Sequence, residues 1–226
     1  INDFTAQALA QHEAADFDRS QLLDGVDDAK APLLVIGPGT GLGVSALIPV
    51  AQGPLPVEGE GGNIRFTPQT GNERDLCDYM EQETDHVVIE HFVSGPGLEN
   101  IYRFLTHAAS TEPSLSTEII ATTALREEGI CRDAVNLMIG ILGAVMGDHV
   151  LTMGCWRGVV ITGGIMPRLQ PLIVSSPLER RFRSVGEMSH ILGKVPVWLS
   201  TDPHAGLKGA RAAFGNPYLA HRMVTG

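Results

Sequence analysis

Basic residues and cysteine are scarce in this sequence, and each shortage narrows the possible functions. With 16 Lys and Arg against 26 Asp and Glu, the chain carries a formal net charge of −10. Nucleic acids and anionic membranes require basic surfaces that neutralise their phosphates, so neither is expected as a partner. Nucleotides stay open as ligands, because backbone amides can hold their phosphates.

The three cysteines form no framework. Cys77, Cys131 and Cys155 are widely spaced and include no CxxC pair, so the pattern indicates neither a set of disulfides nor a zinc site. No uninterrupted apolar run approaches the roughly 18 residues of a membrane span, and no signal peptide precedes the first motif. We therefore expect a protein of the reducing cytoplasm with no membrane partner.

Glycine, in contrast, is plentiful. Its 26 residues exceed the usual share of about 7% and predict many tight turns or close backbone contacts. Hydrophobic residues make up 43% of the 226 positions and charged residues 19%. This composition suffices for the full hydrophobic core of a globular protein.

Hydrophobic periodicity predicts a mixed α/β chain. A core helix is expected over residues 131–155, because this stretch has almost no charge at its centre, and a surface connection is expected over residues 12–31. Further helices are expected over 1–13, 71–84, 98–105, 116–129, 165–176 and 205–215, with short helical pieces over 176–192. Strands are expected over 33–36, 44–50, 64–67, 158–162 and 195–200.

Two glycine motifs are candidate ligand sites. The segment "GPGTGLG" lies between two predicted strands and lacks the Lys of a P-loop, which leaves a hairpin with Thr40 at its tip. Such a turn exposes backbone N–H groups that suit a terminal phosphate, although a plain tight hairpin is an equal alternative. The pair Gly163–Gly164 follows a strand and would let a flat ligand pack on the backbone, but a simple strand-to-helix turn explains it as well.

Three carboxylates stand beside turns or breaks. They are Asp3, Glu60 in "GEGGN" and Glu90 before "SGPGL". Each could grip two adjacent sugar hydroxyls, and one could act as a general base. Taken singly, each is better explained as a solvated charge, so the hypothesis depends on their joint occurrence with the glycine hairpin.

Taken together, the motifs resemble those of the bacterial-type glucokinase family, in the superfamily of hexokinase, Hsp70 and actin. The match comprises "INDFTA", "GPGTGLG", "GEGGN", "SGPGL", "GVVITGGIMPR" and "AGLKGA", in order along nearly the whole chain. The resemblance implies a ribonuclease-H-like (actin-like ATPase) domain, with a mixed sheet and flanking helices. It also implies that residues 1–226 are the larger C-terminal domain of a two-domain sugar kinase. The N-terminal domain with the first, DxGGT-type phosphate loop is absent from this chain, which alone should have little activity.

The resemblance also implies a role for each motif. Asp3 corresponds to the catalytic base and Asn2 to a neighbouring sugar ligand, while Glu60 and Glu90 match the carboxylates that hold glucose. The nucleotide would be held by Gly39, Thr40, Gly41, Gly163 and Gly164. Asn63 stands where the family usually carries a His, so one sugar contact differs here. Mg²⁺ would be held mainly by the nucleotide, since no dedicated cage is evident.

The function implied is ATP-dependent phosphorylation of glucose to glucose 6-phosphate, the first step of glycolysis. A kinase for another hexose is an alternative suggested by Asn63. A non-catalytic sugar-sensing regulator is another, although it would need neither Asp3 nor Thr40. The zinc motif of the related repressor and kinase family is missing, and a homodimer is left open.

Overall fold

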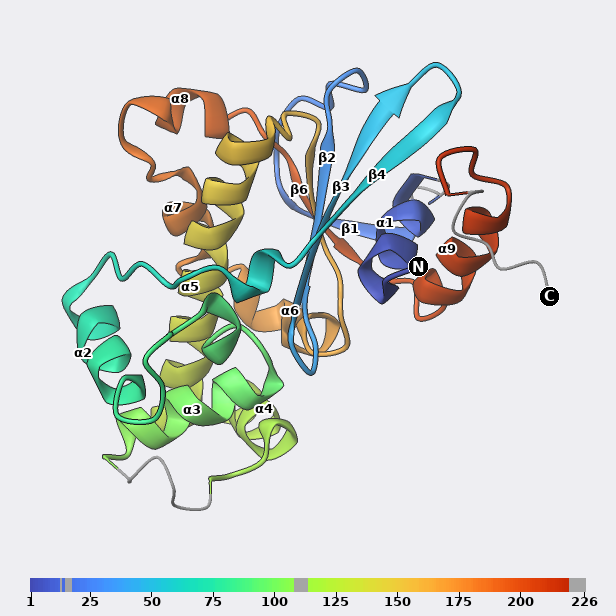
Figure 1. The fold of residues 1–226 in the computed structure, drawn as a ribbon. Helices are drawn as coiled ribbons and strands as arrows, with labels where there is room; N and C mark the ends of the chain where they lie inside the picture. The colour runs from blue at the N-terminus through green and yellow to red at the C-terminus, as the bar shows by residue number, and fades with distance from the viewer. Residues whose placement is uncertain (13, 15–17, 108–113, 220–226) are drawn as a thin grey trace.

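The computed structural model describes residues 1–12, 14, 18–107 and 114–219, and a six-stranded mixed sheet forms its centre (Figure 1). The strand order is β1-β6-β5-β2-β3-β4. Strands β2, β5 and β6 run parallel, while β1, β3 and β4 are antiparallel to their neighbours. The strands are β1 (Arg19–Leu23), β2 (Leu33–Pro38), β3 (Leu42–Val50), β4 (Gly53–Gly59), β5 (Gly158–Ile161) and β6 (Val197–Ser200).

Helices cover both faces of this sheet. Helix α5 (Ile130–Met153) lies against one face, and α1 (Asp3–His12) and α9 (Ala205–Phe214) lie against the other (Figure 1). Successive side chains of a strand point to opposite faces. Accordingly, every residue of β2 is buried, with its side chains divided between the two hydrophobic clusters. The α/β class and the mixed sheet with flanking helices are therefore confirmed.

The remaining helices gather around α5, with α2, α3 and α4 near one of its ends and α7 and α8 near the other (Figure 1). Serine and threonine side chains cap three of them; the Ser116 side chain, for example, accepts from the Ile119 N–H. These helices are α2 (Gly71–Met80), α3 (Gly95–Leu105), α4 (Thr117–Arg126), α6 (Met166–Ile173), α7 (Leu178–Arg183) and α8 (Ser189–Leu192). In the described part of the chain, the connections include the 3₁₀ turns η2 (Gly61–Asn63), η3 (Ile89–His91) and η4 (Gly186–Met188).

Helix α5 is the predicted core helix. By length and composition it could cross a membrane, although its sequence contains no uninterrupted apolar run of about 18 residues. However, 78% of its most apolar window is buried inside the fold. It ends at Gly154, whose left-handed backbone (φ +64°) closes the last turn. Its apolar character is thus explained by packing.

Two strand predictions are wrong. The connection expected over residues 12–31 contains β1, an edge strand in which Leu23 alone is buried, so no alternation marks it. The strand expected over residues 64–67 is reduced to a single bridge between Arg65 and Val88. Strand β4 forms instead over the preceding proline-rich segment, because an edge strand tolerates proline.

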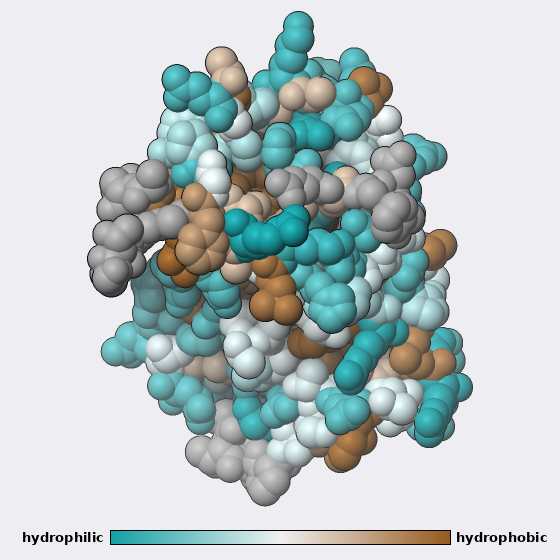
Figure 2. Space-filling model, turned by 90° about the vertical axis from the view of Figure 1, so that its right-hand side faces the viewer, coloured by the Kyte–Doolittle hydropathy of each residue, from teal (hydrophilic) through white to brown (hydrophobic). Residues whose placement is uncertain are grey.

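The surface over α1 and α9 mixes apolar and polar side chains (Figure 2). Leu207 and Phe214 on α9 are 75% and 78% exposed. On the face that Figure 2 shows, apolar side chains are scattered among polar ones and form no single continuous patch.

Candidate functional site

The two glycine motifs lie side by side at the carboxyl ends of β2 and β5. These strands run parallel in register, with Ile36 paired to Ile161. The Thr162 N–H then donates to the Ile36 carbonyl at 2.9 Å. Gly163 has φ +97°, and a Cβ there would overlap the Pro38 carbonyl oxygen. Ligands of open α/β sheets bind beyond such carboxyl ends, so this edge is the natural place for a site.

The predicted hairpin is confirmed, and some of its amides are already used. The Gly39 N–H donates to the Gly41 carbonyl at 2.7 Å, and the Gly39 carbonyl accepts from Gly95 at 2.8 Å. Gly95 opens α3, so the turn is attached to a helix N-terminus, whose dipole favours anions. Among the residues described, the amides of Thr40 and Gly41 have no recorded acceptor, and the Thr40 side chain is exposed. These groups are the donors open to a phosphate.

Glu90 ties a second segment to this hairpin. It lies in the half-buried turn η3, and its Oε2 accepts a hydrogen bond of 2.7 Å from the Leu42 N–H at the start of β3. The Ser94 hydroxyl donates to the Glu90 carbonyl at 2.8 Å and so fixes the backbone. One carboxylate oxygen is thus committed to the hairpin, which leaves Oε1 for a ligand.

Glu60 precedes the short turn η2 and Asn63 is its last residue, and both are exposed. The Asn63 N–H donates to the Glu60 carbonyl at 2.9 Å. The two glycines between them pack where no side chain fits: a Cβ at Gly62 would overlap the Leu42 carbonyl oxygen, and one at Gly61 would lie 2.8 Å from Val44 Cβ. This close contact with β3 explains the second and third glycines of "GEGGN" and brings both polar side chains to the same edge.

The first turn of α1 completes the group. The Phe4 ring occupies the space that a Cβ at Gly43 would fill, so α1 starts directly against β3. The Phe4 N–H donates to Asn2 Oδ1 at 2.7 Å and to Asp3 Oδ1 at 2.9 Å. Asn2 therefore caps the helix, and Asp3 is exposed beside it.

Three contacts hold α1 in this position. The Thr5 hydroxyl donates to Glu58 Oε1 on β4 at 2.7 Å, and the Thr162 hydroxyl donates to Gln7 Oε1 at 3.1 Å. On the other side, a Cβ at Gly209 of α9 would overlap the α1 backbone. The position of Asp3 is thus determined by packing along the whole helix.

Five separate segments therefore meet around the hairpin and the start of β3. They carry every residue that the sequence predicted for the site: Asn2, Asp3, Gly39, Thr40, Gly41, Glu60, Asn63, Glu90, Gly163 and Gly164. The backbone of Gly164 is exposed, and a Cβ there would meet nothing within 4 Å. In the described part of the chain, no group of three or more His, Cys, Asp or Glu side chains could hold a metal ion.

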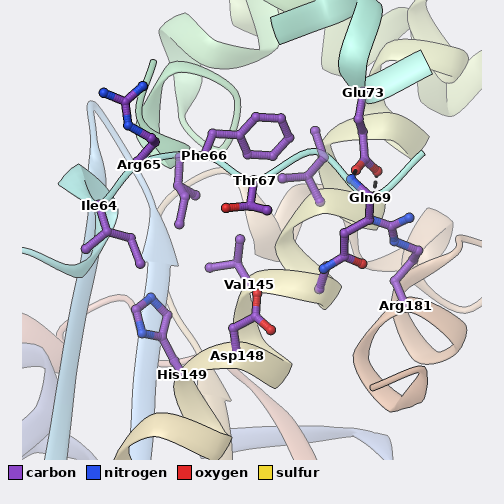
Figure 3. A pocket seen from close by; sticks show the side chains of 13 residues that line it. Ile64, Arg65, Phe66, Thr67, Gln69, Glu73, Val145, Asp148, His149 and Arg181 are labelled. Atoms are coloured by element: carbon purple, nitrogen blue, oxygen red, sulfur yellow. Dashed lines mark hydrogen bonds and ion pairs between the residues drawn. The ribbon is translucent and has the colours of Figure 1, made fainter. Parts of the chain in front are cut away.

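Sequence reasoning missed His149, which lies behind η2. It comes from the apolar helix α5, is only 7% exposed and lines a cavity of about 80 Å³ (Figure 3). A Cβ at Gly61 would lie 3.0 Å from its Cε1. Burial lowers the pKa of His149, while a hydrogen bond with the Gly61 backbone opposes that shift. A lone histidine within an apolar helical pattern carries no sequence signal for this contact.

The opposite wall of the cavity holds a buried ion pair. Arg181 of α7 lies 2.7 Å from Glu73 of α2, and their side chains are 10% and 3% exposed (Figure 3). Glu73 also accepts from the Gln69 N–H at 2.7 Å. A buried pair of this kind links helices rather than binding solvent ions.

Comparison with known proteins gives a consistent result. The model of the glucokinase family matches residues 1–217. The glucokinase of Chromobacterium violaceum is 38% identical over 224 residues, covering 98% of this chain and 64% of its own length. The glucokinase of Neisseria gonorrhoeae is 37% identical over 218 residues, covering 96% of this chain and 66% of its own length. The chain therefore spans about two thirds of the length of these curated relatives.

Solved structures agree. The crystal structure of a glucokinase from an Antarctic psychrotroph matches with a TM-score of 0.85 and 32% identity, covering 96% of this chain and 68% of that one. The glucokinase of Balamuthia mandrillaris in complex with glucose matches with a TM-score of 0.80 and 20% identity. The match covers 93% of this chain and 63% of that one. A ROK family glucokinase from Streptomyces griseus, in complex with glucose and AMPPNP, matches with a TM-score of 0.63 and 20% identity. The match covers 92% of this chain and 65% of that one. The shared architecture is the actin-like ATPase fold, and on the combined matches this chain belongs to the glucokinase family.

Proposed function

We propose that the complete protein containing this chain transfers the terminal phosphoryl group of ATP to the 6-hydroxyl of glucose. Residues 1–226 are proposed to be the larger domain of that kinase. The observation that carries the proposal is the meeting of Asp3, Glu60, Glu90 and the glycine hairpin at one edge of the sheet in a member of the glucokinase family. The relatives in complex with glucose, and with glucose and AMPPNP, support both substrates.

Asp3 is proposed to act as the general base. A primary alcohol is a poor nucleophile, so a carboxylate within hydrogen-bond reach must take its proton as the bond to phosphorus forms. Asp3 is exposed at the first turn of α1, and the Phe4–Gly43 contact fixes that turn against β3. A sugar placed between Asp3 and the hairpin would have the base on one side and, on the other, the backbone N–H groups that donate hydrogen bonds to the phosphate.

The sugar and the phosphate would be held by neighbouring groups. Glu60, Asn63 and Glu90 offer oxygen and amide groups to the hydroxyls, with Asn2 beside the base. The amides of Thr40 and Gly41 would donate to the terminal phosphate, and the backbone at the half-buried Gly163 and the exposed Gly164 would lie under the adenosine.

Mg²⁺ would be bound mainly by the nucleotide oxygens. Among the described residues there is no group of three or more His, Cys, Asp or Glu side chains that could hold the ion, so the proposal assigns it no protein ligand. When bound, the ion neutralises charge on the phosphates. The protein's own contribution is to position the hydroxyl, to accept its proton at Asp3 and to direct the amides of the hairpin at the phosphate.

The test is Asp3→Asn in the complete protein. Asn2 keeps its role as the cap of α1, and the side-chain oxygen of the new asparagine can still accept from the Phe4 N–H, so the substitution removes the base and keeps α1. We expect kcat to fall by about three orders of magnitude, measured as glucose 6-phosphate formed from glucose and Mg-ATP. The exposed Asp24→Asn serves as the control and should leave kcat unchanged. If Asp3→Asn turned over glucose normally, the assignment of the base would be wrong.

Two other functions are distinguished by simple measurements. A kinase for another hexose, suggested by Asn63, would prefer mannose, fructose or glucosamine in a substrate panel. A sugar-sensing regulator would bind glucose in calorimetry and ignore ATP. The exposed Asp3 and Thr40 favour the kinase, because a sensor needs neither.

The domain assignment has its own test. Residues 1–226 expressed alone should show little or no turnover, because closure of a second domain is expected to exclude water and align the phosphate. A cytoplasmic location and a homodimer belong to the same proposal, and fractionation and sedimentation of the complete protein check them.

A further inference from the structure

We propose that Gln7 is a positioning residue: it ties the helix that carries Asp3 to the strand end that leads into the pair Gly163–Gly164. This inference rests on the proposed function, since it gives Gln7 a part in aligning the base with the nucleotide. Gln7 touches neither substrate in this proposal and acts through the hydroxyl of Thr162.

Gln7 lies one helical turn after Asp3 on α1. Residues four apart in a helix are neighbours on one face, and a helical side chain leans toward the turn that precedes it. The side chain of Gln7 therefore lies beside the turn from which Asp3 projects. Its Oε1 accepts a hydrogen bond of 3.1 Å from the Thr162 hydroxyl, although the two residues are 155 positions apart in the sequence. This bond joins the first turns of α1 to the end of β5.

Thr162, on the other side of this bond, is itself held in the sheet. It is 4% exposed, and its N–H donates to the Ile36 carbonyl of β2 at 2.9 Å. A Cβ at Gly37 would lie 2.4 Å from the Thr162 carbonyl oxygen, so the backbone of Thr162 packs directly against the strand that leads into the hairpin. The next residue is Gly163, with φ +97°. A shift of Thr162 would therefore move the start of the glycine pair.

The amide of Gln7 also lies close to α9. A Cβ at Gly206, in the first turn of α9, would lie 3.1 Å from Gln7 Nε2. Among the described residues, Nε2 has no recorded acceptor, so the bond from Thr162 is the recorded hydrogen bond of this side chain. Gln7 thus has one polar contact to lose, and removing that contact isolates its effect.

The groups proposed to hold the sugar are attached to the sheet in another way. Glu60 and Asn63 belong to the η2 segment, and Glu90 bonds to the first amide of β3. In the described part of the chain, none of these three has a recorded hydrogen bond to Gln7 or Thr162. Loss of the Gln7–Thr162 bond is therefore expected to affect turnover and nucleotide affinity and to leave glucose affinity as it is.

The test compares Thr162→Val with Thr162→Ser in the complete protein. Valine keeps the branched shape and removes the hydroxyl, whereas serine keeps the donor. We expect Thr162→Val to raise the KM for ATP and to lower kcat by about three- to tenfold each, the usual range for one lost hydrogen bond, with the KM for glucose unchanged. Thr162→Ser should keep both constants near the parent values. A variant that had only lost stability would lose kcat without a selective change in one KM.

A matched control is Thr106→Val. It removes a half-buried hydroxyl whose recorded acceptors are the Tyr102 and Arg103 carbonyls of α3. This variant should change none of the three constants. A rise in the KM for ATP in Thr106→Val equal to that in Thr162→Val would overturn the inference.

Gln7→Met completes a double-mutant cycle. Methionine keeps the unbranched side chain and removes the amide acceptor. If the bond carries the effect, Gln7→Met should reproduce the losses of Thr162→Val, and the double variant should be no worse than either single variant. Additive losses in the double variant would overturn the inference, as would a KM for ATP that stayed at the parent value in all three.

Nucleotide binding separates this inference from the proposed function. In calorimetry of the complete protein with AMPPNP, Thr162→Val should bind about three- to tenfold more weakly than the parent, and Thr162→Ser should bind as the parent does. If the parent bound AMPPNP but did not phosphorylate glucose, the proposed function would fail, while this measurement would still decide whether the bond supports the nucleotide site. Equal AMPPNP affinity in the parent and Thr162→Val would refute the inference even in an active kinase.

Discussion

The contact between α1 and α9 allows a quantitative test of how the site is supported. Ala6 and Ala10 of α1 are buried against α9, where a Cβ at Gly209 would overlap the Ala6 carbonyl oxygen and lie 2.5 Å from the Ala6 carbonyl carbon. Carbon atoms in ordinary contact lie about 3.5–4.0 Å apart. Gly209→Ala therefore forces the two helices apart by more than about 1 Å. Because the obstruction is backbone, no rotamer change relieves it.

Two opposing effects set the size of the loss. Alanine in place of glycine inside a helix stabilises by about 1 kcal/mol. Overpacking a close contact costs about 1–3 kcal/mol, and the separated helices also lose buried contacts at Ala6 and Ala10. Overpacking should win, with a net loss of about 1–2 kcal/mol. Since α1 carries Asp3, a displacement of this size should also lower kcat by about tenfold or more.

Urea titration and glucose turnover of the complete protein measure both effects. Gly215→Ala, at the end of the same helix, is the matched control, because the nearest heavy atom to its Cβ would be 3.9 Å away. The control should be neutral or slightly stabilising and should keep full activity. Gly209→Ala that was as stable and active as Gly215→Ala would refute the argument that this helix contact positions Asp3.

Glu90→Ala should raise the KM for glucose and for ATP together, by about three- to tenfold each, because it removes both the group proposed to hold the sugar and the acceptor of the Leu42 N–H. An effect on one substrate alone in steady-state kinetics would contradict this. Burial raises the pKa of the Cys155 thiol to about 12, so Cys155 should resist iodoacetamide in the folded protein while the half-exposed Cys77 reacts. Peptide mass spectrometry measures both, and equal labelling would show that Cys155 is accessible. Burial lowers the pKa of His149 below its ordinary 6.5, so the unfolded chain binds more protons there. The stability that the protein has above this pH should therefore fall as the pH drops below 6.5, and His149→Leu should flatten that dependence in urea titrations.

Local patterns predicted most of the elements correctly. The glycine hairpin, followed by the alternating residues over 44–50, predicted β2 and β3. The apolar stretch over 131–155, with almost no charge at its centre, predicted α5. The errors occurred where pairing, not local pattern, makes the strand. Strands β1 and β4 lie at the two edges of the sheet and form because β6 and β3 offer them hydrogen bonds. A five-residue strand with a single buried side chain has no periodicity to detect.

The site residues were likewise chosen from motifs, and their catalytic roles stay predictions. What the sequence supported was the type of chemistry: carboxylates beside turns, glycines suited to phosphate, and the ordered motif set of one family. Why the motifs contain glycine became clear only from their contacts. The Phe4 ring packs against Gly43, where a Cβ would overlap it, and a Cβ at Gly61 would lie 3.0 Å from His149 Cε1.

The sequence by itself determined which segments are helix, hairpin or buried strand, because those choices depend on residues within one or two turns of each other. Only the tertiary structure decided that Glu90 bonds to Leu42, 48 residues away, and that His149 lies against Gly61. Such contacts depend on how helices from distant parts of the chain settle on the two faces of the sheet. No local spacing of residues in the sequence encodes that arrangement, so the contacts that position the site residues are known only from the tertiary packing.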